Sequence, residues 1–220
     1  MKKQGYYVIL LSILIIGSTI GVYIVYHSTE NLKDLNQNLL FHDPLWEGDG
    51  NIISQERAIE GFDSIVLDGV GDVNIHPGEQ YKVVIRTDSN LQDNVIIKVN
   101  GSKLHIDQKQ KRFNSKEMTI DVYMPELKNV TLNGVGDVKV ISGSASKLEI
   151  SLIGTGSIDV KNYHVENAIV VLSGVGDITL WVTQTLKGEH TGVGDILYKG
   201  TPTIKDIDFK GVGSVTTYKQ

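Results

Sequence analysis

Acidic and hydroxyl side chains recur at one fixed position along this chain, directly after a pair of glycines. The six positions are Asp72, Asp137, Ser157, Asp177, Asp195 and Ser214. Carboxylates suit calcium, and two carboxylates stacked about 4.8 Å apart would repel by about 1 kcal/mol in water, which a bound cation would relieve. A cation-stiffened spacer is therefore one interpretation. The two serines, and the lack of further acids beside each aspartate, favour side chains that accept backbone N–H groups at tight turns. We expect no metal site and no cofactor.

A second pattern that could do chemistry is acidic residues near aromatic ones, because glycosidases use paired carboxylates and aromatic rings bind sugars. The acids are Asp159, Asp177 and Asp195, with Trp181 and Tyr198 nearby. Trp181 follows Asp177 by four residues and Tyr198 follows Asp195 by three, so the pairs are not in register. We predict no catalytic residues and a protein that is not an enzyme. Asp177, Trp181, Asp195 and Tyr198 remain candidate binding residues, and a polysaccharide-active β-helix enzyme remains the alternative.

Composition excludes several other classes of protein. The 220 residues include no cysteine, so disulfides, thiolate zinc sites and iron–sulfur clusters are ruled out. There are 21 basic and 26 acidic residues, a net charge of −5, which argues against a nucleic-acid partner. The chain has no phosphate-binding G-K-[S/T] loop, no H-E-x-x-H zinc motif and no G-x-S-x-G nucleophile elbow.

The recurring acids belong to an internal repeat with the formula G-x-G-[D/S] followed by an aliphatic residue. Six copies read LDGVGDVNI, LNGVGDVKV, LIGTGSIDV, LSGVGDITL, HTGVGDILY and FKGVGSVTT. Their first glycines are separated by 65, 20, 20, 18 and 19 residues. We assign the glycines to tight corners between strands, where positive φ or close backbone approach requires them. The predicted structural turn residues are Gly69, Gly71, Asp72, Gly134, Gly136, Asp137, Gly154, Gly156, Ser157, Gly174, Gly176, Asp177, Gly192, Gly194, Asp195, Gly211, Gly213 and Ser214.

Apolar residues alternate with polar ones around these turns, which predicts short strands in an all-β protein. Copies of about 20 residues bury their apolar faces only by stacking on one another, so we predict a right-handed β-solenoid, or β-helix-like domain, of about eight coils. Upstream, residues 73–76 with 81–87, and 95–99 with 104–107, are each predicted to form a β-hairpin. We therefore expect a less regular N-terminal half and a regular stack from about Met118 to Thr217.

A long uncharged segment near the N-terminus predicts a membrane anchor. The chain is uncharged from Tyr6 to Tyr26, long enough for a helix of about 31 Å, and Lys2 and Lys3 precede it. We expect a single-pass protein of the cell membrane with a cytoplasmic N-terminus and an extracytoplasmic domain. A cleaved signal peptide is the alternative. The predicted segments are a cytoplasmic 1–5, a transmembrane 6–26, a stalk or linker 27–52 and a β-solenoid domain 53–220.

Several ordered motifs resemble a known family. RAIEGFDSIVLDGVGDVNI from Arg57, SNLQDNVIIKVNGSKLHI from Ser89, MTIDVYMPELKNVTLNGVGDV from Met118 and the later glycine repeats are similar to the putative auto-transporter adhesin head GIN domain, a bacterial extracytoplasmic domain of unknown function. The resemblance implies a β-helix-like fold, an envelope location and an adhesive role, with no catalytic residues. Since no segment for a membrane barrel follows Gln220, we expect no autotransport by this chain alone.

The expected function is thus a non-enzymatic, adhesin-like binding module or a scaffold of the cell envelope. Its expected partners are the membrane, through residues 6–26, and a cell-surface polysaccharide or protein. An exposed solenoid end would leave unpaired strand edges, so self-association is also open to it.

Overall fold

The computed structural model divides into two compact units, residues 1–45 and residues 46–220. The residues that it describes are 15–16, 19–20, 45–78 and 80–218. In the first unit, β1 (Ile15–Ile16) pairs antiparallel with β2 (Thr19–Ile20). The rest of the predicted anchor, and the predicted stalk up to residue 44, lie outside the described residues. Within the described ranges, no helix combines the length and apolar character needed to cross a bilayer.

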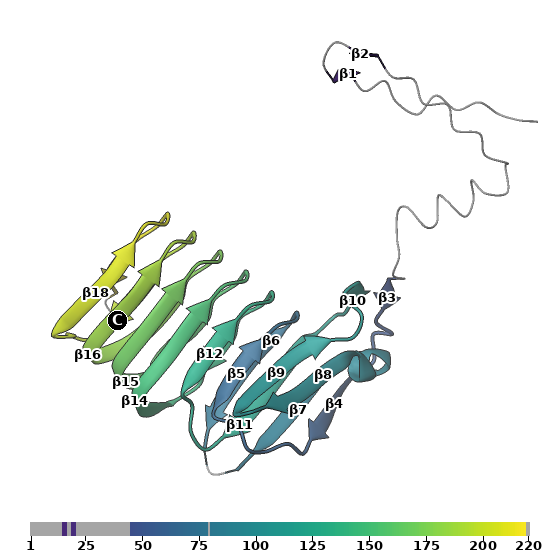
Figure 1. The fold of residues 1–220 in the computed structure, drawn as a ribbon. Coiled ribbons are helices and arrows are strands. Elements are labelled where there is room, and N and C mark those ends of the chain that lie inside the picture. Colours follow the sequence, from purple (N-terminus) through teal and green to yellow (C-terminus); the bar gives the residue numbers. More distant parts are fainter. Residues whose placement is uncertain (1–14, 17–18, 21–44, 79, 219–220) are drawn as a thin grey trace, which may run out of the picture. The chain divides into compact units, whose positions relative to one another are not determined.

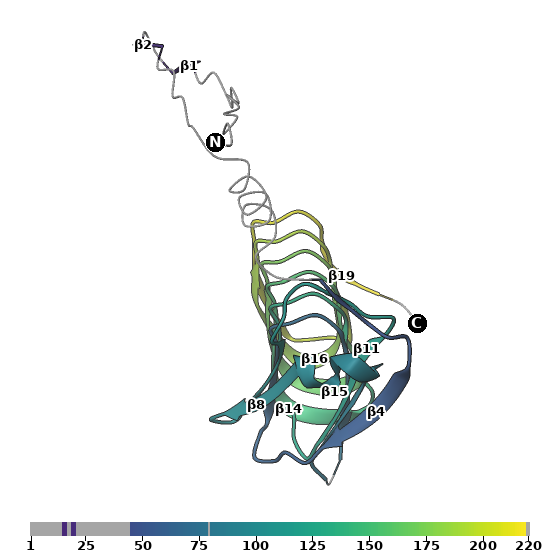
Figure 2. The same cartoon turned by 90° about the vertical axis from the view of Figure 1, so that its right-hand side faces the viewer.

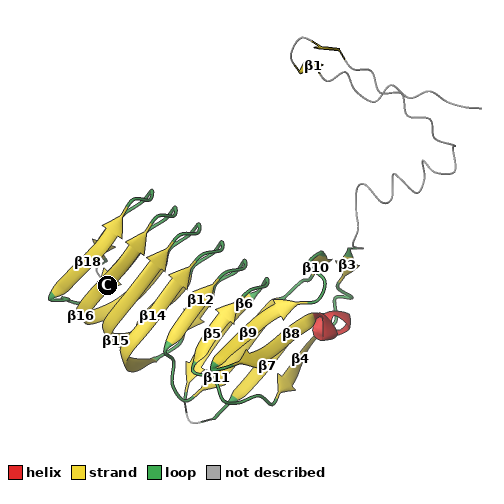
Figure 3. Cartoon of the chain, viewed as in Figure 1, coloured by secondary structure: helices red, strands yellow, loops and turns green. Residues whose placement is uncertain are grey.

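The second unit consists almost entirely of strands, which confirms the all-β prediction (Figure 3). One short 3₁₀ helix, η1 (Ser89–Asn94), interrupts them. The strands are β3 (Trp46–Glu47), β4 (Ile52–Arg57), β5 (Ser64–Leu67), β6 (Asp72–Pro77), β7 (Lys82–Asp88), β8 (Val95–Asn100), β9 (Lys103–Gln108), β10 (Phe113–Asn114), β11 (Met118–Met124), β12 (Asn129–Leu132), β13 (Val138–Val140), β14 (Gly143–Leu152), β15 (Ile158–Leu172), β16 (Ile178–His190), β17 (Ile196–Lys199), β18 (Ile204–Phe209) and β19 (Val215–Thr217).

The six glycine repeats lie side by side as parallel strands, with their turns along one edge (Figure 1). Before the turns, the strands pair in the order β5, β12, β14, β15, β16, β18. After the turns, the order is β6, β13, β15, β16, β17, β19. Equivalent residues are paired at the turns, so copies separated by 18 to 20 residues in sequence are neighbours in space, although the register between β15 and β16 shifts between Val160 and Asn167.

The sheet curls around a continuous apolar core (Figure 2). Residues two positions before the first glycine point inward and stack in one column. Its members are Leu67, Leu132, Leu152, Leu172, His190 and Phe209. The first five are fully buried, whereas Phe209, in the last copy, is 44% exposed. The alternation of apolar and polar residues therefore places one face of the inner strands of the array, such as β12, β14, β15 and β16, in the core.

The N-terminal part of the unit is less regular, as predicted, but only one of the two predicted hairpins forms. β8 and β9 pair antiparallel around Asn100-Gly101, which confirms that hairpin. The prediction that residues 73–76 and 81–87 form a hairpin is wrong. β11 lies between β6 and β7, parallel to β6 and antiparallel to β7. β11 fits there because Ile120, Val122 and Met124 alternate inward and are fully buried.

The gap of 65 residues between Gly69 and Gly134 does not separate them in space. Val70 bridges Val135 directly, so the first two glycine copies are adjacent. The intervening chain forms the strands from β7 to β11 and extends the sheet beyond the first copy. The expectations of about eight coils, and of a regular stack beginning near Met118, are therefore wrong. Six copies stack, and the first begins at Ser64.

The segment before β4 is fixed to this unit through one buried carboxylate. Asp88 is fully buried. It accepts hydrogen bonds from Gly50 N at 2.6 Å, Ser115 Oγ at 2.7 Å and Lys116 N at 3.0 Å. The Ser115 hydroxyl and the two backbone N–H groups hold the pKa of Asp88 below its usual value. Close by, β3 pairs with β10, so the compact unit begins at Trp46.

Candidate functional site

The glycine turns form one edge of the stack, which we call the turn corner. It comprises residues 69–72, 134–137, 154–157, 174–177, 192–195 and 211–214. Val135 N donates to Gly69 O at 2.9 Å, and the other copies repeat this bond. A Cβ on Gly134 would lie 1.8 Å from Gly69 O. Gly176 has φ of +132°, and its Cβ would lie 1.7 Å from Gly156 O. Glycine is therefore required here by close approach of neighbouring backbones.

The acidic residues of the turn corner bond to the following copy. Asp137 Oδ1 accepts from Ser157 N at 2.8 Å, and Asp177 Oδ1 accepts from Asp195 N at 2.7 Å. Asp195 Oδ1 in turn accepts from Ser214 N at 2.7 Å and from Ser214 Oγ at 2.8 Å. Among the described residues, no three metal-ligating side chains are grouped closely enough to hold an ion. The candidate residues Asp177 and Asp195 thus contribute to contacts between copies.

An aliphatic side chain lies between the two glycines of most copies and points to solvent. Val70, Val135, Val175, Val193 and Val212 are between 41% and 67% exposed. Thr155 takes this position in the third copy and forms the same backbone bridges. The bridges therefore do not depend on a valine side chain, and the turn corner presents a row of small apolar side chains on neighbouring copies.

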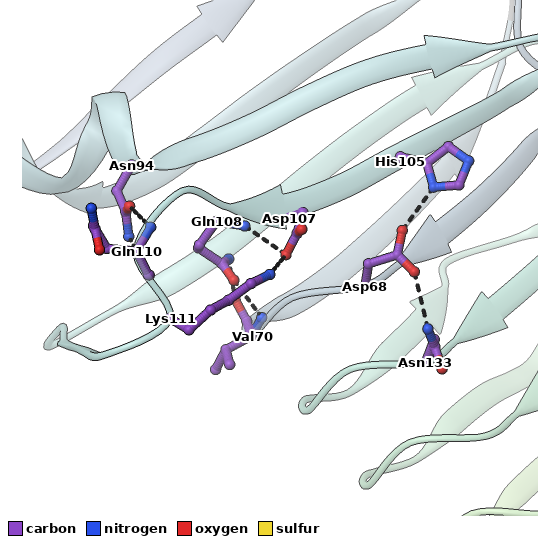
Figure 4. Close-up of polar contacts among 9 residues, drawn as sticks. All are labelled: Asp68, Val70, Asn94, His105, Asp107, Gln108, Gln110, Lys111 and Asn133. Atoms are coloured by element: carbon purple, nitrogen blue, oxygen red, sulfur yellow. Dashed lines mark hydrogen bonds and ion pairs between the residues drawn. The ribbon is translucent and has the colours of Figure 1, made fainter. Parts of the chain in front are cut away.

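Gln108 closes the free end of the turn corner beside the first copy (Figure 4). Its Oε1 accepts from Val70 N at 2.8 Å and its Nε2 donates to Val70 O at 2.8 Å. Gln108 is only 2% exposed. Because Val135 makes the equivalent two bonds to the copy before it, the Gln108 amide replaces the backbone of a preceding copy. Sequence reasoning missed this role, since a glutamine ending β9 carries no local signal.

Beside this cap, Asp68 connects three neighbouring strands (Figure 4). His105 Nδ1 lies 2.7 Å from Asp68 Oδ2, and Asn133 Nδ2 donates to Asp68 Oδ1 at 3.2 Å. His105 belongs to β9, Asp68 follows β5 and Asn133 follows β12. These polar contacts join the first copy to the strands on both sides of it.

The two aromatic candidates have different surroundings. Tyr198 is 8% exposed and belongs to the core, so its ring offers no open face to a sugar. Trp181 is half-buried on the outer surface. Lys199 Nζ lies 4.1 Å from the centroid of the Trp181 ring, and the His164 ring contacts its other side edge-on at 4.7 Å. The structure therefore brings Trp181 together with Lys199 and His164 rather than with Asp177.

A cavity of about 340 Å³ lies at the opposite ends of the strands from the first-copy turn, where β6 ends at Pro77. We call this region the cavity corner. Its lining includes His76, Lys82 and Tyr123, together with residues 77–78, 80 and 141–142. The His76 and Tyr123 rings stack at 4.5 Å between centroids with an interplanar angle of 13°. Lys82 Nζ lies 4.5 Å from the centroid of the Tyr123 ring.

One carboxylate fixes the imidazole at the cavity corner. Asp121 Oδ1 lies 3.0 Å from His76 Nε2 and accepts from Asn74 Nδ2 at 3.2 Å. Asp121 is not among the lining residues, so this bond leaves His76 Nδ1 as the uncommitted ring nitrogen. Sequence reasoning missed this site because its side chains come from β6, β7 and β11, which are far apart in sequence and paired in space.

Some lysines elsewhere on the surface, such as Lys147, Lys161 and Lys210, pair with carboxylates. Lys161 Nζ lies 2.7 Å from Asp159 Oδ2, and this bond raises the pKa of Lys161. Lys82 and Lys199, by contrast, each lie over an aromatic ring, and neither has an ion pair within the part of the chain that the structure describes. Their ammonium groups are therefore available to an anion, and Lys82 alone of the two lines the cavity.

Comparisons with known proteins agree on the fold. A family model described as "Putative auto-transporter adhesin, head GIN domain" matches residues 61–142 and 129–202. A structure from Bacteroides fragilis described as a putative adhesin is 23% identical, with a TM-score of 0.54 over 78% of this chain and 99% of that one. A structure from Parabacteroides distasonis described as a putative lipid binding protein is 21% identical, with a TM-score of 0.52 over 80% and 100%. None of the curated proteins matches the chain.

Proposed function

Because the chain belongs to the family of putative auto-transporter adhesin head GIN domains, we propose that it is a non-enzymatic, extracytoplasmic module that binds a cell-surface polysaccharide. In this proposal residues 6–26 anchor it in the cell membrane as a single-pass protein with a cytoplasmic N-terminus. The uncharged run from Tyr6 to Tyr26, preceded by Lys2 and Lys3, supports the anchor.

The proposed scaffold is a right-handed β-solenoid. In-register parallel pairing of β12, β14, β15 and β16, and the unbroken series of bridges from Val70 to Val212, support it. Right-handed crossovers are the general rule for parallel strands. A stack of this kind is stabilised by contacts between neighbouring copies and presents a long, rigid surface.

One observation carries the proposal of a binding module. The repeated polar groups of the turn corner bond to other copies, and the described lining residues of the cavity corner supply cationic and hydrogen-bonding side chains and no carboxylate. The proposal therefore assigns binding to the region where the sequence departs from the repeat. Nothing in the arrangement of Asp177 and Asp195 resembles a pair of carboxyl groups facing a common substrate space, since each bonds to the next copy.

The experiment that tests this function uses the full 220-residue chain in mild detergent, mixed with insoluble cell-wall and host polysaccharides. The expected result is retention of the protein on at least one polymer, without release of soluble fragments or new reducing ends. Release of reducing ends that is lost in Asp177→Asn or Asp195→Asn would instead establish an enzyme. No retention on any polymer would contradict polysaccharide binding and leave a protein partner or self-assembly.

A further inference from the structure

The cavity corner contains the features that select a class of ligand. Its volume of about 340 Å³ is at the lower end of the range for small-molecule sites, which suits one or two sugar units. Lys82 supplies a cation, Gln80 an amide and Ser142 a hydroxyl, and no acid is found among the lining residues that the structure describes. A cavity that is rich in donors and carries a positive charge favours an anionic, hydroxyl-bearing ligand over a neutral apolar one.

The position of Lys82 makes its ammonium group accessible to such a ligand. Contact with the Tyr123 ring at 4.5 Å orients the lysine without neutralising its charge. A ligand carboxylate would form a charge-assisted hydrogen bond with Nζ, which is about twice as strong as a neutral one. Lys82 can keep its contact with the ring while donating to that carboxylate.

Tyr123 lies between two partners, and this limits how a sugar can bind. His76 stacks on one side of the ring, and Lys82 lies over the ring as well. The ring is therefore not an open platform for the apolar face of a neutral sugar. Recognition at this site has to come from polar atoms at the edges of the cavity.

His76 is held in one orientation by its bond to Asp121 at 3.0 Å. With Nε2–H donating to that carboxylate, Nδ1 is the ring nitrogen left to a ligand, and in the neutral imidazole it accepts a hydrogen bond from a sugar hydroxyl. The site thus combines a fixed acceptor with a cation on the two sides of one tyrosine.

We infer that the cavity corner binds a carboxylate-bearing sugar unit of an acidic polysaccharide, with Lys82 pairing with the carboxylate and His76 accepting from a hydroxyl. This inference rests on the proposed function and names its substrate class. It assigns recognition to residues outside the glycine repeats.

The test is a calorimetric titration of the full chain in mild detergent with oligogalacturonates, which are composed of uronic acid units. Malto-oligosaccharides of the same length are the neutral comparison. We expect the uronate oligomers to bind at least about tenfold more tightly than the neutral ones, with an affinity that falls as salt is raised. Dextran sulfate that binds as tightly as the uronates would overturn the assignment to a carboxylate.

Two variants of lysine separate a role of the cavity from a general effect of charge. Lys82→Met keeps most of the side-chain length, and we expect about a tenfold loss of uronate affinity or more. Lys199 lies over the Trp181 ring as Lys82 lies over the Tyr123 ring, but neither Lys199 nor Trp181 is among the lining residues of the cavity. Lys199→Met removes the same charge and should leave the affinity within about twofold. Ser142 lines the cavity and is exposed, so Ser142→Trp should obstruct the cavity and abolish binding without lowering the melting temperature.

The outcomes distinguish this inference from the function on which it rests. If the chain is retained on polysaccharides but Lys82→Met and Ser142→Trp bind like the unaltered protein, the site is wrong and the function stands. Equal affinity for uronate and neutral oligomers would likewise overturn the substrate class. If no polymer and no oligomer binds, the proposed function is contradicted as well.

Discussion

The turn corner and the cavity corner use side chains in opposite ways. At the turn corner the same residue types recur in copy after copy, and Asp137, Asp177 and Asp195 bond to the backbone of the next copy. At the cavity corner, Lys82, Tyr123 and His76 occur once and come from three different strands. Repeated residues therefore build the scaffold, whereas the residues that line the cavity lie where the repeat is interrupted.

The interruption itself has a structural cause. The chain between the first and second copies leaves the stack and returns through β7 and β11. This excursion places β11 beside β6, which brings Tyr123 against His76, and it also supplies Gln108, which closes the turn corner. The first copy is therefore both the end of the repeat array and the edge of the candidate site.

The largest expected effect is at a turn glycine. Gly176→Ala would place a Cβ 1.7 Å from Gly156 O at a φ of +132°, so we expect a loss of more than about 4 kcal/mol in the free energy of unfolding, or failure to fold. Denaturant unfolding measures it. Gly101→Ala is the matched control, because it has a φ of +61° but no atom within 4 Å, and should lose only about 1 kcal/mol. Equal losses would show that close approach is not what requires glycine at the turns.

The cap of the turn corner comes next. Gln108→Ala removes two hydrogen bonds and leaves the N–H and C=O of Val70 without them, so unfolding should require about 2 kcal/mol less. Amide hydrogen exchange should also speed up at Val70 more than at Val175, since the latter lies within the stack. Gln184→Ala changes an exposed glutamine and should have no measurable effect. A Gln108→Ala protein as stable as the original would mean that the end of the array needs no cap.

A smaller loss is expected from the acidic row. Asp195→Ala removes the acceptor for Ser214 N and Oγ at a half-exposed site, so we expect about 1 kcal/mol of destabilisation in denaturant unfolding. The matched control is Asp206→Ala on the exposed surface of β18, which should stay within about 0.5 kcal/mol. If Asp195→Ala stabilised the protein, repulsion along the row would outweigh the hydrogen bonds.

The smallest effect is expected from calcium. Because the turn carboxylates already accept backbone N–H groups of the next copy, we predict the same melting temperature with millimolar calcium as with a chelator. A rise of several degrees with calcium but not with magnesium would restore the cation-stiffened spacer and move the functional chemistry to the turn corner.

The sequence predicted the turns and much of the strand pattern because both depend on local rules. The G-x-G formula identifies corners, and Asn100-Gly101 identifies the hairpin of β8 and β9. The sequence could not predict that β11 separates β6 from β7, because that pairing depends on which distant strand fills the core. The stack of Lys82, Tyr123 and His76 was missed for the same reason.

One candidate could have been judged better from the sequence. Within β17, Tyr198 has the same parity as the buried Ile196, so strict alternation places it in the core. Trp181 has the parity of Asp177 and lies outside. Strand parity, rather than spacing along the chain from an acid, decides which aromatic rings a ligand can reach.

The most direct test of the central claim is to map a bound ligand on the molecule. Backbone amide shifts of the full chain, recorded by NMR in mild detergent, would be followed during titration with oligogalacturonates. We expect saturable shifts at Lys82, Tyr123 and Ser142 and unchanged signals at Val135 and Val175 on the turn corner. Shifts confined to the turn corner would contradict the central claim and assign binding to the repeated residues.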